Sequence, residues 1–190
     1  MDTINSQELL LLSPEYLLVV DLEATCCDAG TIEKHESEII EIGAILVSLI
    51  SKKEVCSFNE FIKPIRHPKL TSFCTQLTSI TQADVNSAKP LKDVMDAWRE
   101  WLQPFKSSYV MCSWGNYDRN HIISDCEYFD VNNPIDGKHL NLKAAFAKKQ
   151  KIKRCGLQRA LSFAGLEFKG QHHRGIDDAR NIVRLLDYCI

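Results

Sequence analysis

The sequence lacks the features that would place it in a membrane, a secretory route or a repeat array. Its longest leucine run, LLLL at 9–12, is far too short to span a bilayer, and the flanking Asp2 and Glu8 do not form the basic start of a secretory signal. The 190 residues contain no internal repeat, linker or low-complexity tract. We therefore expect a cytoplasmic protein with no membrane contact, in which residues 1–190 form a single domain.

The sequence also lacks a strong net charge and a paired cysteine motif. With a formal net charge of -2 at pH 7, it has no global attraction for nucleic acid, so a polyanion would need local basic patches or bound cations. The eight cysteines show no C-x-x-C spacing of the kind that indicates a zinc site or a redox motif. Most are expected to be small buried side chains, and the vicinal pair Cys26–Cys27 is the exception because it directly follows an acidic segment.

The sequence does contain an alternation of strand and helix patterns. Three segments rich in Val, Ile and Phe predict strands that pair as a meander: 16–21, 38–48 and 54–63. Helical spacing of apolar residues and one further apolar run predict the remaining elements: helices at 70–77, 91–102, 118–129, 157–164 and 175–190, and a strand at 108–113. This order predicts an α/β fold with helices packed against a mixed sheet.

The segment VVDLEAT at 19–25 ends an apolar strand with two acids on alternate positions. Because residues i and i+2 of a strand point to the same side, Asp21 and Glu23 are expected to lie together. Two close carboxylates repel each other and raise a pKa, which costs stability unless a proton or a cation compensates. The pair therefore predicts a compensating group at the end of this strand.

Two further acids are predicted to face inward. Asp118 begins the buried stripe of its helix, and Asp178 lies at the edge of the inward stripe of the last helix, where an unpaired carboxylate would be costly. The neighbouring Asp177 instead shares a face with Arg180 and Asn181. We expect that face to be solvated and its ion pairs to be weak.

The four inward acids, Asp21, Glu23, Asp118 and Asp178, come from different elements that can converge at one end of a sheet. Hard oxygen ligands suit Mg²⁺ or Mn²⁺. Two such ions, about 3.5–4 Å apart, can activate a water and stabilise the leaving oxygen in phosphodiester hydrolysis. His173, just before the helix that carries Asp178, would accept the proton of the attacking water because a neutral imidazole is available at pH 7.

These residues resemble the motifs of the DEDDh 3′–5′ exonucleases, relatives of the proofreading subunit of DNA polymerase III and of RNase T. DLEAT at 21–25 resembles the first motif, SWGNYD at 113–118 the second and HHRGIDDARNI at 172–182 the third, whose spacing selects His173 and Asp178. The segments FNEFIKPIRHPKLTSFCTQLTSIT and GLEFKGQHHRGIDDARNIVRLL carry a closer similarity to the Eri1-type histone mRNA and small-RNA exonucleases and the KapD proteins.

The resemblance implies an RNase H-like fold with a central mixed five-stranded sheet, two bound metal ions and release of nucleoside 5′-monophosphates from a 3′ end. It also implies that Ala24 and Thr25 lie where the family grips the terminal nucleotide. Single-stranded or 3′-overhanging RNA is the leading substrate. DNA stays open because no residue identifies a reader of the 2′-hydroxyl. A regulatory protein that keeps the fold but acts by binding a partner is the third alternative.

Two features outside the acids favour contact with nucleic acid. Trp114 and Tyr117 lie close to Asp118 and would stack on a base, an interaction worth roughly 1–3 kcal/mol in single-strand binders. The alternative is packing against the sheet, which we favour for Trp114. The segment KKQKIKR at 148–154 is the most basic in the chain, and it either guides a phosphate backbone toward the site or forms a solvated loop.

Overall fold

The computed structural model describes residues 2–106, 108–135 and 137–190, and its centre is a mixed six-stranded sheet of order β1-β6-β5-β2-β3-β4. The strands are β1 Asp2–Ile4, β2 Tyr16–Ala24, β3 Ile39–Ser48, β4 Glu54–Phe61, β5 Tyr109–Ser113 and β6 Lys138–Asn141. The predicted meander is confirmed, since β2, β3 and β4 pair antiparallel in succession. On the other side of β2, strands β5, β6 and β1 are parallel neighbours.

The expected number of five strands is wrong by one. The three-residue β1 extends the edge of the sheet by pairing with β6. A strand this short has no periodic pattern to read, and its place at the edge depends on a partner more than a hundred residues away. The α/β class and the mixed sheet are as predicted.

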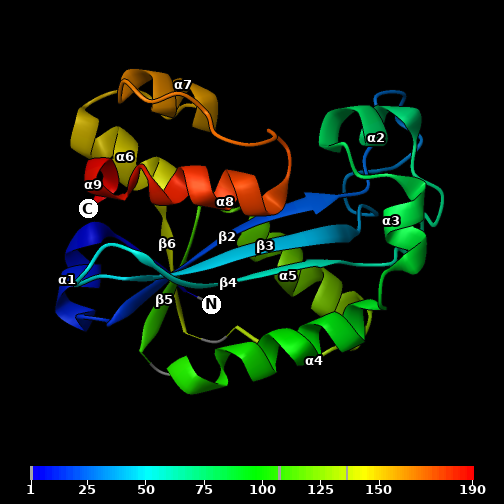
Figure 1. The fold of residues 1–190 in the computed structure, drawn as a ribbon, viewed down its shortest axis with the longest axis horizontal. Helices are drawn as coiled ribbons and strands as arrows, with labels where there is room; N and C mark the ends of the chain where they lie inside the picture. The colour runs from blue at the N-terminus through cyan, green and yellow to red at the C-terminus, as the bar shows by residue number, and fades with distance from the viewer. Residues whose placement is uncertain (1, 107, 136) are drawn as a thin grey trace.

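Helices cover both faces of this sheet (Figure 1). The helices are α1 Ser6–Leu12, α2 Ser72–Thr78, α3 Gln82–Ser87, α4 Leu91–Leu102, α5 Tyr117–Tyr128, α6 Leu142–Gln150, α7 Leu157–Phe163, α8 Gly175–Val183 and α9 Leu186–Cys189, with a 3₁₀ turn η1 at Gln103–Phe105. Successive residues of β2 point into different cores: Leu17 and Val19 pack with α6–α9, and Leu18 and Val20 with α4 and α5. A strand buried on both faces reads as a continuous apolar run, which explains the VV that precedes Asp21.

The last predicted helix is interrupted. It was expected to continue from residue 175 to the C-terminus, but α8 ends at Val183 and α9 begins at Leu186. The break turns Leu186 and Cys189 onto α6, where the Cys189 thiol donates to the Leu142 carbonyl at 3.6 Å. Apolar spacing continues across this bend, so the pattern could not reveal it. No helix in the described parts of the chain is both long enough and apolar enough to cross a membrane.

Candidate active site

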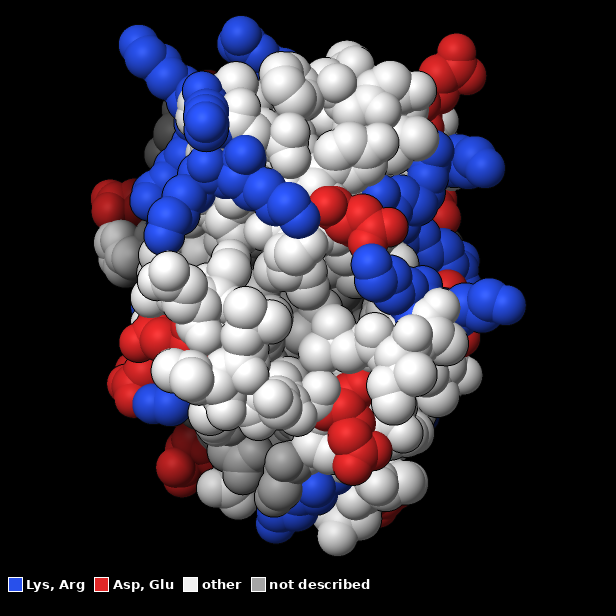
Figure 2. Space-filling model, turned by 90° about the vertical axis from the view of Figure 1, so that its left-hand side faces the viewer, with Lys and Arg blue, Asp and Glu red and all other residues white. Residues whose placement is uncertain are grey.

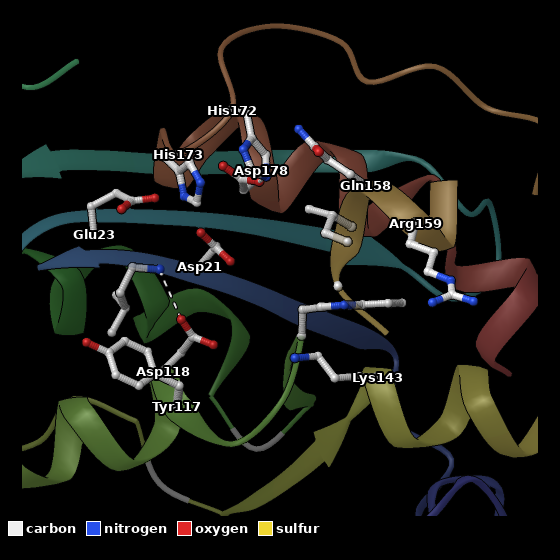
Figure 3. A pocket seen from close by; sticks show the side chains of 14 residues that line it. Asp21, Glu23, Tyr117, Asp118, Lys143, Gln158, Arg159, His172, His173 and Asp178 are labelled. Carbon is white, nitrogen blue, oxygen red and sulfur yellow. Dashed lines mark hydrogen bonds and ion pairs between the residues drawn. The ribbon is translucent and has the colours of Figure 1, made fainter. Parts of the chain in front are cut away.

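The four predicted acids meet on the floor of a cleft of about 580 Å³. Asp21 and Glu23 come from β2, Asp118 from the first turn of α5 and Asp178 from the first turn of α8. One carboxylate oxygen each from Asp21, Glu23 and Asp178 lie within 4.8 Å of one another. Asp118 is held against β2 because its Oδ1 accepts the Leu22 N–H at 3.2 Å. Figure 3 shows these carboxylates facing one another across the cleft.

Helix α8 reaches this position through direct backbone contact with the sheet. Asp21 pairs with Gly43 in the β2–β3 ladder, and Gly43 lies under Gly175, the first residue of α8. A Cβ at Gly43 would be 2.1 Å from the Gly175 carbonyl carbon, and a Cβ at Gly175 would be 2.8 Å from the Asp21 carbonyl oxygen. Contacts this short exclude any side chain, so the two glycines allow the close approach that brings Asp178 beside Asp21.

A fifth acid fixes the start of α8. Glu41 lies directly opposite Glu23 in the ladder and is fully buried. Its carboxylate accepts hydrogen bonds from Arg174 Nε and Nη2, each at 3.1 Å, and from the Gly175 N–H at 3.0 Å. The Arg174 guanidinium also lies 5.0 Å from the centre of the Phe61 ring. Because this buried pair is hydrogen-bonded on both sides, Glu41 anchors the helix and is neutralised within the chain.

The other four carboxyl groups have raised pKa values. Burial raises the pKa of Glu23 to about 9, and the charges of Asp178 and Glu41 add to the shift. Burial likewise raises the pKa of Asp178 to about 7 and that of Asp118 to about 6. Desolvation raises the pKa of Asp21 well above its usual value, with further contributions from Asp118 and Asp178. An all-oxygen set that retains protons near neutral pH fits hard divalent cations, which would displace those protons.

Two adjacent histidines form the wall above the acids. The His172 and His173 rings are 3.9 Å apart between centres, and His172 Nε2 lies 3.7 Å from Asp178 Oδ1. Figure 3 places His173 between Glu23 and His172. Burial, followed by the neighbouring His172, lowers the pKa of His173. A neutral imidazole can accept a proton, so His173 has the position and the charge state expected of a general base.

Comparison with known proteins assigns this arrangement to a family. Residues 18–186 match the family model described as Exonuclease (RNase_T). The chain belongs to this exonuclease family. It is 30% identical to the 3′-5′ exonuclease Snipper of Drosophila melanogaster over 95% of the chain and 71% of that protein. It is 32% identical to ERI1 exoribonuclease 2 of Mus musculus over 90% of the chain but only 28% of that much longer protein.

Solved structures agree with the family assignment. The nuclease domain of 3′hExo, described as a DEDDh family member bound to rAMP, aligns with a TM-score of 0.85 and 26% identity over 98% of this chain and 96% of that one. A 3′-exonuclease described as recognising the 3′ end of a histone mRNA stem-loop aligns with a TM-score of 0.84 and 26% identity over 93% and 84%. The expected RNase H-like fold and DEDDh resemblance are confirmed, and the oxygen ligands fit the divalent metal ions that this exonuclease family uses.

The prediction of a weak ion pair on the polar face beside Asp178 is wrong. Asp177 makes no surface ion pair with Arg180; its Oδ2 accepts the Gln171 N–H at 2.8 Å. Arg180 instead contacts Glu54 at 3.6 Å, and Asn181 is fully buried, with its amide bonded to the Lys169 backbone. The segment that precedes α8 folds back along this side of the helix and buries Asn181, whereas Arg180 stays exposed.

The two aromatic residues near Asp118 differ in role. Trp114 is only 8% exposed; its Nε1 donates to the Cys155 carbonyl at 3.0 Å and its ring packs against Phe146, as favoured from the sequence. Its edge still lines the cleft. Tyr117 is 47% exposed where it lines the cleft, and its ring packs edge-on against His121 at 5.1 Å between centres. Stacking of Tyr117 on a base stays a prediction.

Ala24 is the last residue of β2, and Thr25 follows it. Both are buried just beyond Glu23, and neither is among the residues that line the cleft. The Thr25 hydroxyl accepts the Glu38 N–H at 2.9 Å, and the Thr25 carbonyl accepts a hydrogen bond from the Ser37 hydroxyl. These hydrogen bonds of Thr25 fix the chain just beyond β2, and a contact of Ala24 and Thr25 with a terminal nucleotide stays a prediction.

Two basic residues of the cleft were not predicted. Lys143 from α6 and Arg159 from α7 line it toward the end away from Glu23 (Figure 3). The positive charge of Lys143 opposes the rise in the pKa of Asp118. Both are ordinary charged positions on short helices, and nothing in their local pattern distinguishes them from solvated residues.

Proposed function

We propose that this chain is a metal-dependent 3′–5′ exoribonuclease that acts on single-stranded or 3′-overhanging RNA and releases nucleoside 5′-monophosphates. The observation that carries the proposal is the convergence of four carboxylates from β2, α5 and α8 on the floor of one cleft. Relatives named as exoribonucleases, and a solved relative whose description names the 3′ end of histone mRNA, support RNA over DNA as the substrate.

The metal site would consist of Asp21, Glu23, Asp118 and Asp178, with two Mg²⁺ or Mn²⁺ ions. The ions would supply positive charge for the phosphate and lower the pKa of a bound water. The chain orients its ligands through backbone donors, since Leu22 N–H binds Asp118 and Arg174 N–H binds Asp178 Oδ2 at 3.2 Å. These donors orient Asp118 and Asp178 before substrate arrives.

The hydrolysis adds water across one phosphodiester bond. His173 accepts one proton of the water at an imidazole nitrogen as the water oxygen bonds to the phosphorus of the terminal nucleotide. The bond from that phosphorus to the 3′ oxygen of the preceding nucleotide breaks, and this oxygen takes up a proton to become the new 3′ end. The terminal nucleotide leaves with its phosphate on the 5′ oxygen. Solvent supplies the proton on the new 3′ hydroxyl and receives the proton that His173 accepted, so His173 returns to its neutral form.

A degradation time course tests this function. RNA and DNA oligomers of the same sequence, labelled at the 5′ end, are incubated with the protein in EDTA, Mg²⁺ or Mn²⁺. We expect a ladder that shortens from the 3′ end of RNA and requires a divalent ion, with mononucleotides as the other product. A matched RNA with a blocked 3′ end is the control. Cleavage of the blocked RNA, or no ladder with either ion from folded protein, would contradict the proposal.

A further inference from the structure

The acidic cleft continues into a second cavity over α7. This cavity has a volume of about 620 Å³ and is lined by Ile152, Lys153, Arg154, Arg159, Ser162 and Phe163. Arg159 also lines the acidic cleft and therefore joins the two spaces. We call the surface formed by Lys153, Arg154, Arg159 and Phe163 the α6–α7 groove. It contains the end of the basic segment noted in the sequence.

The cations of the α6–α7 groove have no acidic partner among the described residues. Lys153, Arg154 and Arg159 are all exposed. Lys52 by contrast is paired with Asp187, and the exposed cations Lys53 and Lys89, also unpaired within the described part of the chain, line neither cavity. Figure 2 shows Lys and Arg side chains gathered on the upper part of one face, at the level of α6 and α7 in Figure 1. A cluster of unpaired like charges on a protein of net charge -2 favours a polyanionic partner.

An aromatic ring lies among these charges. Phe163 is 52% exposed, and its ring is fixed edge-on against the fully buried Phe146, 5.9 Å between centres at 80°. Phe146 also packs against Trp114, whose edge lines the acidic cleft. An exposed ring held by the core, beside free cations, is the combination that single-strand binders use: charges for the phosphates and a stacking platform for a base.

The distribution of charge also gives the direction of the strand. The Lys and Arg side chains that line the acidic cleft, Lys143 and Arg159, both lie on the side of α6 and α7. At the other end, Tyr117 leads to a pocket with a single exposed Lys or Arg, Lys34, beside the His35–Glu33 pair at 3.3 Å. A phosphate chain that leaves four carboxylates is attracted more strongly toward the side with the larger number of unpaired cations.

We propose that the α6–α7 groove binds the RNA strand on the 5′ side of the nucleotide being removed. The proposal rests on the function proposed above, because it takes the four acids as the place of cleavage. Phosphates of the upstream nucleotides contact Lys153, Arg154 and Arg159, and one upstream base stacks on Phe163.

Equilibrium binding tests the groove independently of catalysis. Fluorescence anisotropy with a labelled single-stranded RNA of about 12 nucleotides, in EDTA, is measured at about 50 to 200 mM salt. The double variant Lys153→Gln/Arg154→Gln should bind the RNA more weakly. The slope of log affinity against log salt concentration should become less steep by about 1.4, since each lost phosphate contact contributes about 0.7 on single strands. The control Lys53→Gln/Lys89→Gln makes the same charge change at exposed residues outside both cavities and should leave the slope as in the wild type.

The ring is tested by Phe163→Leu, which keeps an apolar side chain against Phe146 but cannot stack. We expect about tenfold weaker binding of the same RNA, within the range for loss of one stacked base. Thermal melting of the variant separates this loss from unfolding. In steady-state cleavage, both groove variants should raise KM for the long RNA relative to KM for a dinucleotide, which is too short to reach the groove.

Each outcome of these experiments decides one proposal. If Lys153→Gln/Arg154→Gln binds RNA with the affinity and salt slope of its charge-matched control, the groove does not hold the strand, even if the protein degrades RNA from the 3′ end. If the wild type cleaves no RNA, the proposed function fails, and the binding measurements still decide whether the groove binds single strands.

Discussion

Without metal, the protein is expected to lose stability as the pH rises from about 7 to 8.5, because of Glu23. Burial raises the pKa of this carboxyl from 4.5 to about 9 in the folded state. Between those two values the unfolded chain is ionised while the folded chain keeps the proton. The stabilising contribution is therefore complete below the unfolded pKa and is lost as the pH rises through the folded pKa.

The size of the effect follows from the difference of one bound proton. Each pH unit in this window lowers the free energy of unfolding by about 1.4 kcal/mol, so the rise from pH 7 to pH 8.5 removes about 2 kcal/mol. For a domain of this size, 1 kcal/mol corresponds to about 2–4 °C in Tm. We expect Glu23 to account for a fall of roughly 4–8 °C.

The assay is thermal melting in EDTA at several pH values in this window, with wild type, Glu23→Gln and Glu127→Gln. Glutamine cannot titrate, so the Tm of Glu23→Gln should fall less between pH 7 and pH 8.5 than the Tm of the wild type, by roughly 4–8 °C. The Tm of Glu127→Gln, a substitution at an exposed residue of α5, should fall as in the wild type. Comparing the slopes of Tm against pH between the variants and the wild type removes the contribution of all other titrating groups. Addition of Mn²⁺ should raise Tm, and more strongly at high pH, because metal binding requires deprotonated ligands. Equal slopes for wild type and Glu23→Gln would refute the reasoning that a cation has to compensate this carboxyl.

Three substitutions test the remaining parts of the site. Asp178→Asn should reduce 3′-end cleavage of RNA to background. Asp177→Asn should keep most of the activity, because the Asp177 side chain faces the preceding loop. If a cleavage assay gave the reverse order, it would contradict the placement of α8. His173→Ala should lower the single-turnover rate by roughly 10²–10⁴-fold at saturating RNA and metal, and more than His172→Ala, which loses the 3.7 Å contact with Asp178; a wild-type rate would exclude His173 as the base. Gly43→Ala should lower the free energy of unfolding in urea by roughly 3 kcal/mol or more, because its Cβ would lie 2.1 Å from the backbone of α8; an unchanged midpoint would show that the contact is loose.

The inward direction of the four acids was readable from the sequence because it is a local property. The period of a strand places Asp21 and Glu23 on one side, and the period of a helix separates Asp178 from Asp177. Each prediction needed only a few neighbouring residues. The meander of β2, β3 and β4 was readable for the same reason, since consecutive strands with short connections commonly pair.

The segment that packs against a helix or a strand comes from a distant part of the chain, so the local sequence does not reveal it. The wrong predictions for Asp177 and for the number of strands have this cause. The polar helical neighbours of Asp177 predict a solvated side chain, but the chain before α8 returns along that side and places a backbone donor, Gln171 N–H, on its carboxylate. The same limit applies to β1, whose strand character depends on β6. The contact of Gly43 with Gly175 joins residues 132 positions apart, and either glycine alone resembles an ordinary loop or strand position.

The structural acid Glu41 differs from the proposed metal ligands because it has an ion-pair partner, and not because of where it lies. Glu23 and Glu41 lie opposite each other on β2 and β3, both buried, and strand periodicity treats them alike. Arg174 neutralises Glu41 through hydrogen bonds from Nε and Nη2 and so fixes α8, whereas Glu23 has no Lys or Arg partner in the described part of the chain. A buried carboxylate without an internal cation either keeps its proton or binds an external cation. The arginine that precedes α8 therefore removes one acid from the set available to metal and leaves four, each contributed by an element that the fold brings to the same edge of the sheet.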